Sequence, residues 1–239
     1  VKQDGILCGV ELAKKIFAKF DPTLKMTQYL HDGDAIKKGD VAFVVEGKTI
    51  SILQTERLVL NFMQRLSGIA TQTHEYVKLL EGTGTKILDT RKTTPGLRLL
   101  EKYAVKVGGG ENHRIGLYDM ILIKDNHIDY AGGVTAAITK TKEYLKAKGK
   151  NLKIEVEART LDEIKEILNF DVDRILIDNF TPEETKTAVA LINGKCKTES
   201  SGGITKESIR AYAEAGVDYI SVGALTHHIS SLDLSLKAF

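Results

Sequence analysis

Short apolar runs rich in Ile and Val alternate with stretches of helical periodicity from Lys86 onward. This alternation is typical of strands and helices built around a parallel sheet. We expect strands at residues 87–89, 120–123, 154–157, 174–178, 196–200 and 219–222, with residues 104–107 as a weaker seventh strand. The pattern therefore predicts an α/β fold in which strands alternate with helices.

The helices between these strands have recognisable ends. Apolar residues recur at helical spacing over residues 134–145, which predicts a helix that packs on the sheet. Thr160 and Thr181 each stand three residues before a glutamate, which is a pattern of helix starts. Thr205 is expected to start a further helix, which Gly216 ends.

The chain before Lys86 has a different pattern of apolar and polar residues. Strand-like fragments over residues 26–53 are interrupted by turn signals, and residues 54–80 have the periodicity of one long helix. The apolar face expected for this helix consists of Leu58, Phe62, Leu66 and Ile69. Residues 232–236 alternate like a strand that returns to this first part. We therefore expect one domain at residues 1–66 plus 228–239 and a second at residues 67–227.

Composition and charge narrow the class of function. Of the 239 residues, 42% are hydrophobic and 28% are charged, the balance of a globular protein. A net charge of +2 is too small to indicate binding to nucleic acid or an anionic membrane, so small-molecule partners are expected. Cys8 and Cys196 lack the spacing of a zinc knuckle or disulfide framework, which favours a cytoplasmic location. The sequence opens on Val1 rather than on Met, which is compatible with a preceding segment that this sequence does not include.

Basic residues follow two of the expected strands. Because the carboxyl ends of parallel strands meet at one rim, Arg91 and Lys92 should lie near Lys124. Arg114 stands between these segments and follows His113, which by itself is best explained as a structural histidine. A single charged residue at a strand end is usually a solvated loop residue, but four cations together favour a ligand with more than one anionic group.

Two further features are expected at the same rim. The sequence from Glu199 to Gly203 precedes a helix, and Gly223 follows the last strand, so backbone amides there could bind a phosphate. Glu157 and Asp178 follow their strands and could accept ribose hydroxyls or hold Mg²⁺. The alternative is that these two acids only balance nearby cations.

Several motifs together resemble quinolinate phosphoribosyltransferase, also called nicotinate-nucleotide pyrophosphorylase (carboxylating). The most specific is DTRKTTPGLRLLEKYAVKVGGGENHRIGLYDMILIKDNHI at residues 89–128. It is followed by IEVEA, ILIDNF, ESSGGI and ISVGALTHH in the order of the family, while TER at residues 55–57 and SGIAT at residues 67–71 precede it. These motifs cover most of the chain.

The resemblance implies transfer of phosphoribose from 5-phosphoribosyl 1-diphosphate to quinolinate with loss of carbon dioxide, which gives nicotinate mononucleotide for NAD biosynthesis. It implies Mg²⁺ as cofactor and a homodimer, and an open α/β sandwich domain followed by a seven-stranded TIM-like barrel. Members of the family carry a few dozen further residues before the part that matches residues 5–18, so part of the dimer edge is expected to lie outside this sequence.

The resemblance also assigns residues to roles. Those expected to act in catalysis are Lys92, Glu157 and Asp178, and the last two are also the expected metal ligands. Those expected to bind quinolinate are Arg57, from a neighbouring subunit, and Arg91, Lys92, His113, Arg114 and Lys124. Those expected to bind phosphoribosyl diphosphate are Lys124, Glu157, Asp178, Ser201, Gly202, Gly203, Gly223 and His227.

Three alternatives compete with this hypothesis. Lys124 at a strand end could form a Schiff base in an aldolase, although its charged neighbours do not make an apolar lysine pocket. A sensor that binds phosphoribosyl compounds would bind ligand without turnover. A related transferase of molybdate-associated loci shares the fold and acts on a related acid.

Overall fold

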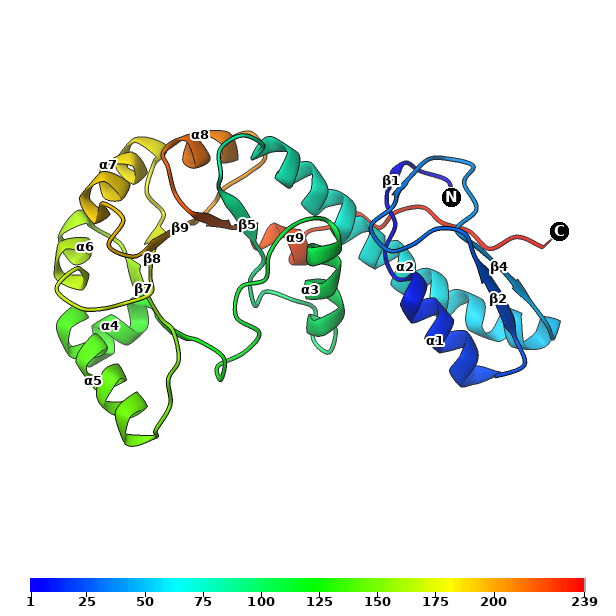
Figure 1. Cartoon of the computed structure of the whole chain (residues 1–239), viewed down its shortest axis with the longest axis horizontal. Helices are drawn as coiled ribbons and strands as arrows, with labels where there is room; N and C mark the ends of the chain where they lie inside the picture. The colour runs from blue at the N-terminus through cyan, green and yellow to red at the C-terminus, as the bar shows by residue number, and fades with distance from the viewer. Residues whose placement is uncertain (239) are drawn as a thin grey trace. The chain divides into compact units, whose positions relative to one another are not determined.

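The computed structural model describes residues 1–238 and divides them into two compact units (Figure 1). Unit 1 consists of Val1–Val77, Lys92–Asn112 and the described residues from Gly223 onward, and unit 2 consists of Lys78–Arg91 and His113–Val222. No helix in residues 1–238 is both long enough and apolar enough to cross a membrane.

Unit 2 contains a six-stranded parallel sheet in the order β5-β10-β9-β8-β7-β6. The strands are β5 Lys86–Leu88, β6 Ile121–Ile123, β7 Ile154–Ala158, β8 Arg174–Asp178, β9 Lys197–Ser201 and β10 Tyr219–Ser221. Since all strands run in one direction, their carboxyl ends lie at one edge. The α/β pattern and six of the expected strand positions are confirmed.

Helices follow the strands of unit 2 and lie along the outer side of the curved sheet (Figure 1). They are α4 Asp125–Ala131, α5 Val134–Ala147, α6 Leu161–Ile167, α7 Pro182–Ile192 and α8 Ile209–Glu214. The hydroxyl oxygens of Thr160 and Thr181 accept hydrogen bonds from the third helical residue, as predicted. The start predicted at Thr205 is wrong, because residues 206–208 form a turn and α8 begins after Ser208.

Residues 104–107 do not form the weaker seventh strand. They belong to α3 Arg98–Val107 in unit 1, whose buried side chains include Glu101, Ala104 and Val105. The spacing of three and four residues is that of a helix face, whereas a half-buried strand would alternate. The local Ala-Val-Lys-Val run was therefore misleading.

Unit 1 combines short antiparallel strand pairs with helices. Its other elements are β1 Gly5–Ile6, α1 Val10–Phe20, β2 Lys25–Gln28, β3 Ala35–Ile36, β4 Phe43–Glu46, most of α2 Thr49–Leu79, and α9 Ala224–His227. Strand β1 pairs with β3, and β2 pairs with β4. Residues 49–53, which we expected to be strand-like, form the first turns of α2.

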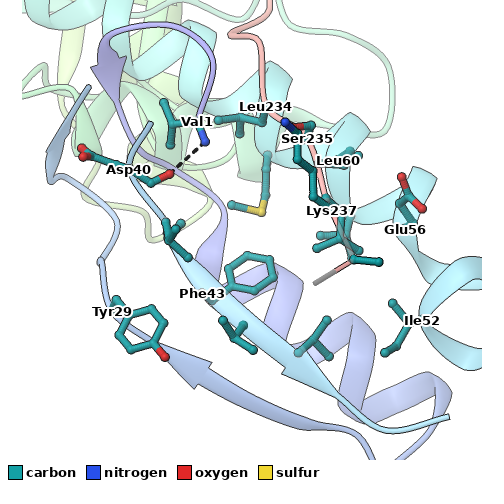
Figure 2. A pocket seen from close by; sticks show the side chains of 18 of the residues that line it. Val1, Tyr29, Asp40, Phe43, Ile52, Glu56, Leu60, Leu234, Ser235 and Lys237 are labelled. Carbon is teal, nitrogen blue, oxygen red and sulfur yellow. Dashed lines mark hydrogen bonds between the residues drawn. The ribbon is translucent and has the colours of Figure 1, made fainter. Parts of the chain in front are cut away.

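The buried face of α2 differs from the predicted one. Leu66 and Ile69 are buried, but Leu58 is 50% exposed, and Val59 and Met63 are buried instead. Beside this helix, unit 1 has a cavity of about 1050 Å³ lined mainly by apolar side chains, among them Phe43 and Leu60 (Figure 2). The apolar pattern correctly located the helix. In its first half, however, the predicted buried residues lie one position before the residues that are buried.

The segment after His228 returns to unit 1 without forming a strand. Leu232 and Leu234 are buried in its core, in keeping with the predicted alternation. The backbone of Leu232 donates to the carbonyl of Gln64 at 2.9 Å, so the segment binds to helix α2 rather than to a sheet. Gly68 allows this approach, because an added Cβ would overlap the carbonyl oxygen of Ser230.

Candidate functional site

Three of the predicted basic residues line one cavity in unit 2. Arg91, Arg114 and Lys124 surround a space of about 550 Å³, together with apolar side chains of β6 and α5. Arg114 is 8% exposed, and its Nη1 donates to the carbonyl of Met120 at 3.2 Å. The cavity therefore offers several fixed cationic groups at one point, which suits an acid with more than one negative charge.

The positive charges in this cavity are crowded. Burial, followed by the neighbouring Arg91 guanidinium, lowers the pKa of Arg114 from its usual value. A guanidinium that is buried beside another cation lacks the stabilisation that water would give it. An anion bound here would supply the missing negative charge.

Two ionisable residues of the cavity were not among the predicted site residues. Lys140 comes from α5, and its Nζ donates to the carbonyl of Ala131 at 3.2 Å. His127 follows Lys124 in the sequence, and its Nδ1 accepts a hydrogen bond from the Lys124 backbone at 3.0 Å. His127 could have been found from its place after the strand, whereas Lys140 lies mid-helix in a sequence with many surface lysines.

His113 is part of a buried polar cluster with Glu155 and Glu199. The imidazole Nε2 lies 2.9 Å from a Glu155 oxygen and 3.6 Å from a Glu199 oxygen. Both carboxyl groups are fully buried, and the guanidinium of Arg174 binds Glu199. Nδ1 of His113 accepts a hydrogen bond from the Arg114 backbone at 2.7 Å, so the ring proton is on Nε2.

One guanidinium faces two carboxyl groups in this cluster, and burial favours a proton on one of them. Burial raises the pKa of Glu155, against the opposing effect of Arg174. Burial and the neighbouring Glu155 carboxylate raise the pKa of Glu199 to about 7. The pair therefore holds a proton at pH values at which exposed glutamates are ionised.

This raised pKa predicts a dependence of stability on pH. The folded chain keeps a proton that the unfolded chain loses near the usual value of 4.5, so the stabilisation is complete below that pH and disappears as the pH rises through about 7. Glu199→Gln removes the titration. Wild type should lose about 2 kcal/mol of its free energy of unfolding between about pH 5 and about pH 8, and the variant should not show this loss. Urea titrations at both pH values measure this difference, and a difference independent of pH would contradict the assignment.

Glu157 and Asp178 lie at the carboxyl ends of the adjacent strands β7 and β8. Burial and the nearby Asp178 carboxylate raise the pKa of Glu157, while Lys124, whose Nζ lies 3.9 Å from a Glu157 oxygen, opposes the rise. Two carboxylates that repel each other provide oxygen ligands of the kind that Mg²⁺ prefers, so the residues fit this ion.

The loop at residues 201–203 lies beside Asp178, because Ser201 pairs with Asp178 in the sheet. Gly202 has a φ of +102°, and a Cβ there would overlap the side-chain oxygen of Asn179 and lie 2.9 Å from its backbone nitrogen. Gly203 also has a positive φ, of +60°, but nothing lies within 4 Å of its added Cβ. Only Gly202 therefore requires the absence of a side chain for packing.

Four predicted site residues belong to unit 1. Lys92, Gly223 and His227 are neighbours there, because a Cβ at Gly223 would lie 3.0 Å from both side chains. The carbonyl of Lys92 accepts a hydrogen bond from the hydroxyl of Thr226 at 2.9 Å, which joins its segment to α9. Arg57 is exposed on α2. The other predicted residues belong to unit 2.

A partly buried ion pair that the sequence did not reveal holds the loop after Lys92. The Arg65 guanidinium binds Glu101 at 2.6 Å and donates to the hydroxyl of Thr94 at 2.7 Å. Glu101 also accepts a hydrogen bond from the backbone of Thr94 at 3.0 Å. Arg57 and Arg65 recur at helical spacing in the sequence, and this was the available signal for Arg65. Its partner Glu101 was not identified, because the nearby residues 104–107 were expected to form a strand rather than part of α3.

Comparison with known families and proteins gives one consistent result. The model of the quinolinate phosphoribosyl transferase N-terminal domain matches residues 1–67, and that of the C-terminal domain matches residues 69–237. Quinolinate phosphoribosyltransferase [decarboxylating] 2b, mitochondrial, of Nicotiana tabacum is 46% identical over 99% of this chain and 71% of its own length. The probable nicotinate-nucleotide pyrophosphorylase [carboxylating] of Bacillus subtilis (strain 168) is 46% identical over 98% of this chain and 80% of its own. The crystal structure of NadC from Streptococcus pyogenes superposes with a TM-score of 0.94 at 41% identity, over 99% of this chain and 83% of that one.

Proposed function

Because the chain belongs to the quinolinate phosphoribosyl transferase family, we propose that it transfers phosphoribose from 5-phosphoribosyl 1-diphosphate to the ring nitrogen of quinolinate. The products are nicotinate mononucleotide, carbon dioxide and diphosphate, which places the enzyme in NAD biosynthesis. The main support within the molecule is the cavity of unit 2, where Arg91, Arg114 and Lys124 meet. Quinolinate has two carboxylates on one ring, and such a cluster of cations suits it.

The cationic residues bind and orient the acid in this proposal. Arg91 and Arg114 form paired hydrogen bonds with carboxylates, and Lys124 adds a third positive charge near the carboxyl end of β6. The family resemblance adds His113, Lys92 and, from a neighbouring subunit, Arg57. Fixing the ring in this way aims its nitrogen at the sugar carbon, so the attack does not wait for a rare encounter in solution.

The carboxylates at the ends of β7 and β8 stabilise the transferring sugar. As diphosphate leaves, positive charge develops on the ribose ring, and Glu157 and Asp178 place negative charge beside it. The same two residues would hold Mg²⁺, which when bound neutralises the charge of the diphosphate. Lys92 is assigned to catalysis with them. Lys124, 3.9 Å from Glu157, lies next to both the acid and the sugar.

Phosphate groups bind at glycine-containing segments. Ser201 ends β9, Gly202 and Gly203 follow it, and this segment offers backbone amides beside Asp178. Gly223 and His227, at the start and end of the short helix α9, are assigned to the phosphate as well. After transfer, the cationic ring nitrogen stabilises the carbanion left on the adjacent ring carbon when its carboxylate departs as carbon dioxide. A proton from water then takes the place of the carboxylate, so decarboxylation needs no further cofactor.

The finer architecture is also part of the proposal. We assign residues 1–66 plus 228–239 to an open α/β sandwich domain and residues 67–227 to a TIM-like barrel. The assembly is a homodimer with shared active sites in the cytoplasm, although several plant relatives have mitochondrial or chloroplastic in their names. The high similarity to solved NadC structures supports the architecture.

Product analysis tests this function. Incubation with Mg²⁺, quinolinate and 5-phosphoribosyl 1-diphosphate should yield nicotinate mononucleotide, and omission of either substrate should abolish it. Failure to form product with any pyridine acid would contradict the proposal. Borohydride trapping of a carbonyl substrate on Lys124 would instead support the aldolase. Turnover of a different acid with quinolinate inert would favour the related transferase of molybdate-associated loci.

A further inference from the structure

Glu155 is a buried acid that does not line the cationic cavity of unit 2. It lies in the interior of β7, and it is fully buried, whereas most charged side chains remain in water. A buried carboxyl group destabilises a fold unless polar partners surround it, and an apolar side chain of similar size would be less costly. Its retention in the core therefore calls for an explanation in terms of what it contacts.

The contacts of Glu155 lead to the cavity through one residue. A Glu155 oxygen lies 2.9 Å from Nε2 of His113, and Nδ1 of His113 accepts the hydrogen bond from the Arg114 backbone at 2.7 Å. The backbone nitrogen of His113 in turn donates to Asp89 at 2.9 Å. Both ring nitrogens of His113 therefore face groups of the protein, and the ring fixes the backbone from which the Arg114 side chain extends.

We propose that Glu155 is a positioning residue that acts through His113 on Arg114 and so sets the affinity of the enzyme for quinolinate. A Glu155 oxygen lies 2.9 Å from Nε2 of His113, although neither Glu155 oxygen forms a hydrogen bond in the described structure. An acceptor oxygen beside Nε2 favours the ring proton on that nitrogen, which leaves the lone pair of Nδ1 for the Arg114 amide. Arg174 and Glu199 complete the cluster: an Arg174 guanidinium nitrogen lies 4.0 Å from the other Glu155 oxygen and binds Glu199, which itself lies 3.6 Å from Nε2 of His113. A binding residue holds its productive geometry only when the residues around it fix its position, so a supporting residue can affect affinity without touching the ligand.

This inference rests on the proposed function, and a double-mutant cycle separates the two. The dissociation constants for quinolinate and for 5-phosphoribosyl 1-diphosphate are measured by calorimetry for wild type, Glu155→Ala, His113→Asn and the double variant. We expect Glu155→Ala to weaken quinolinate binding at least tenfold and to change phosphoribosyl diphosphate binding less than threefold. In the His113→Asn background, the same change should weaken quinolinate binding less than twofold further, because Asn has no atom at the position of Nε2 and the contact with Glu155 is already lost.

Glu155→Gln and Asp173→Ala are the control variants. The Gln carboxamide oxygen can still face the His113 Nε2–H, so quinolinate binding should stay within about threefold of wild type. Asp173 accepts the backbone hydrogen bond of Ile154 at the other end of the same strand, at 2.8 Å, so its loss should lower the unfolding temperature without altering quinolinate binding. Equal losses for Glu155→Ala and Glu155→Gln, or multiplicative losses in the double variant, would overturn the proposal.

A second pair of variants carries the test if Glu155→Ala does not fold. His113→Asn keeps an acceptor near the position of Nδ1, and His113→Gln keeps a polar group near that of Nε2. Action through the Arg114 backbone predicts tighter quinolinate binding in His113→Asn than in His113→Gln, and the reverse order would overturn it. If the wild-type enzyme neither binds nor turns over quinolinate, the proposed function itself fails.

Discussion

Replacing Arg114 with alanine should lower kcat/KM for quinolinate by about a thousandfold. Arg114 is a buried cation in the cavity of unit 2, so its removal leaves a substrate carboxylate desolvated and without its partner. Loss of one partner of a buried charge pair costs about 3 to 5 kcal/mol, and each 1.4 kcal/mol is about a factor of ten. Steady-state kinetics with quinolinate as the varied substrate measure the loss.

Binding of the second substrate provides the control for this variant. The dissociation constant for 5-phosphoribosyl 1-diphosphate should change less than about threefold in Arg114→Ala. Arg159→Ala removes an arginine from the same unit whose partners are Asp129 and Glu163 on the surface, and both substrates should bind it normally. Equal weakening of both substrates in Arg114→Ala would refute the division into an acid side and a sugar phosphate side.

Gly202→Ala should lower kcat/KM for 5-phosphoribosyl 1-diphosphate by about a hundredfold or more. The added Cβ would overlap the side chain of Asn179, and alanine does not readily adopt the φ of +102° found there. The loop beside Asp178 must therefore move, and with it the backbone amides proposed to bind phosphate. A displacement of about 1 Å at a positioning group can cost about a hundredfold in rate.

The neighbouring glycine is a matched control for the loop. Gly203 has a φ of +60° and no atom within 4 Å of an added Cβ, so Gly203→Ala pays only the conformational cost of about 1 kcal/mol. Quinolinate binding should be unchanged in both variants. If Gly203→Ala is as damaging as Gly202→Ala, the contact with Asn179 is not the cause of the defect.

The sequence predicted the sheet of unit 2 well because most of its strands are short runs containing Ile, Leu or Val that lead into polar residues, although β9, with the sequence KTESS, is polar throughout. Unit 1 was harder to predict. Residues 104–107 have the composition of a strand, but their neighbours Glu101 and Lys102 are buried on a helix face, and tertiary packing decided the outcome. Residues 232–236 have the alternation of a strand, yet their backbone groups bind Gln64 of α2 and the backbone of Lys2 rather than another strand.

The candidate site was predictable where charged residues stand at strand ends and hidden where they lie inside the fold. Arg91, Arg114 and Lys124 share one cavity as expected. Glu155 was not predicted as a site residue, because Glu157, two residues later, already provided the acidic group expected at the end of this strand. Residues two apart in a strand face the same side, so the Glu155–Val156–Glu157 pattern already placed both acids on one face of the sheet. The partners Glu199 and Arg174 come from other strands, and no local pattern identifies such pairs.

The most direct test of the proposed reaction follows the carboxylate that is lost. Quinolinate labelled with ¹³C in the carboxyl group next to the ring nitrogen is mixed with the enzyme, Mg²⁺ and 5-phosphoribosyl 1-diphosphate, and the reaction is followed by NMR. We predict labelled carbon dioxide and unlabelled nicotinate mononucleotide in equal amounts, and neither without the phosphoribosyl donor. Retention of the label in the pyridine product, or release of the label without the donor, would contradict the account.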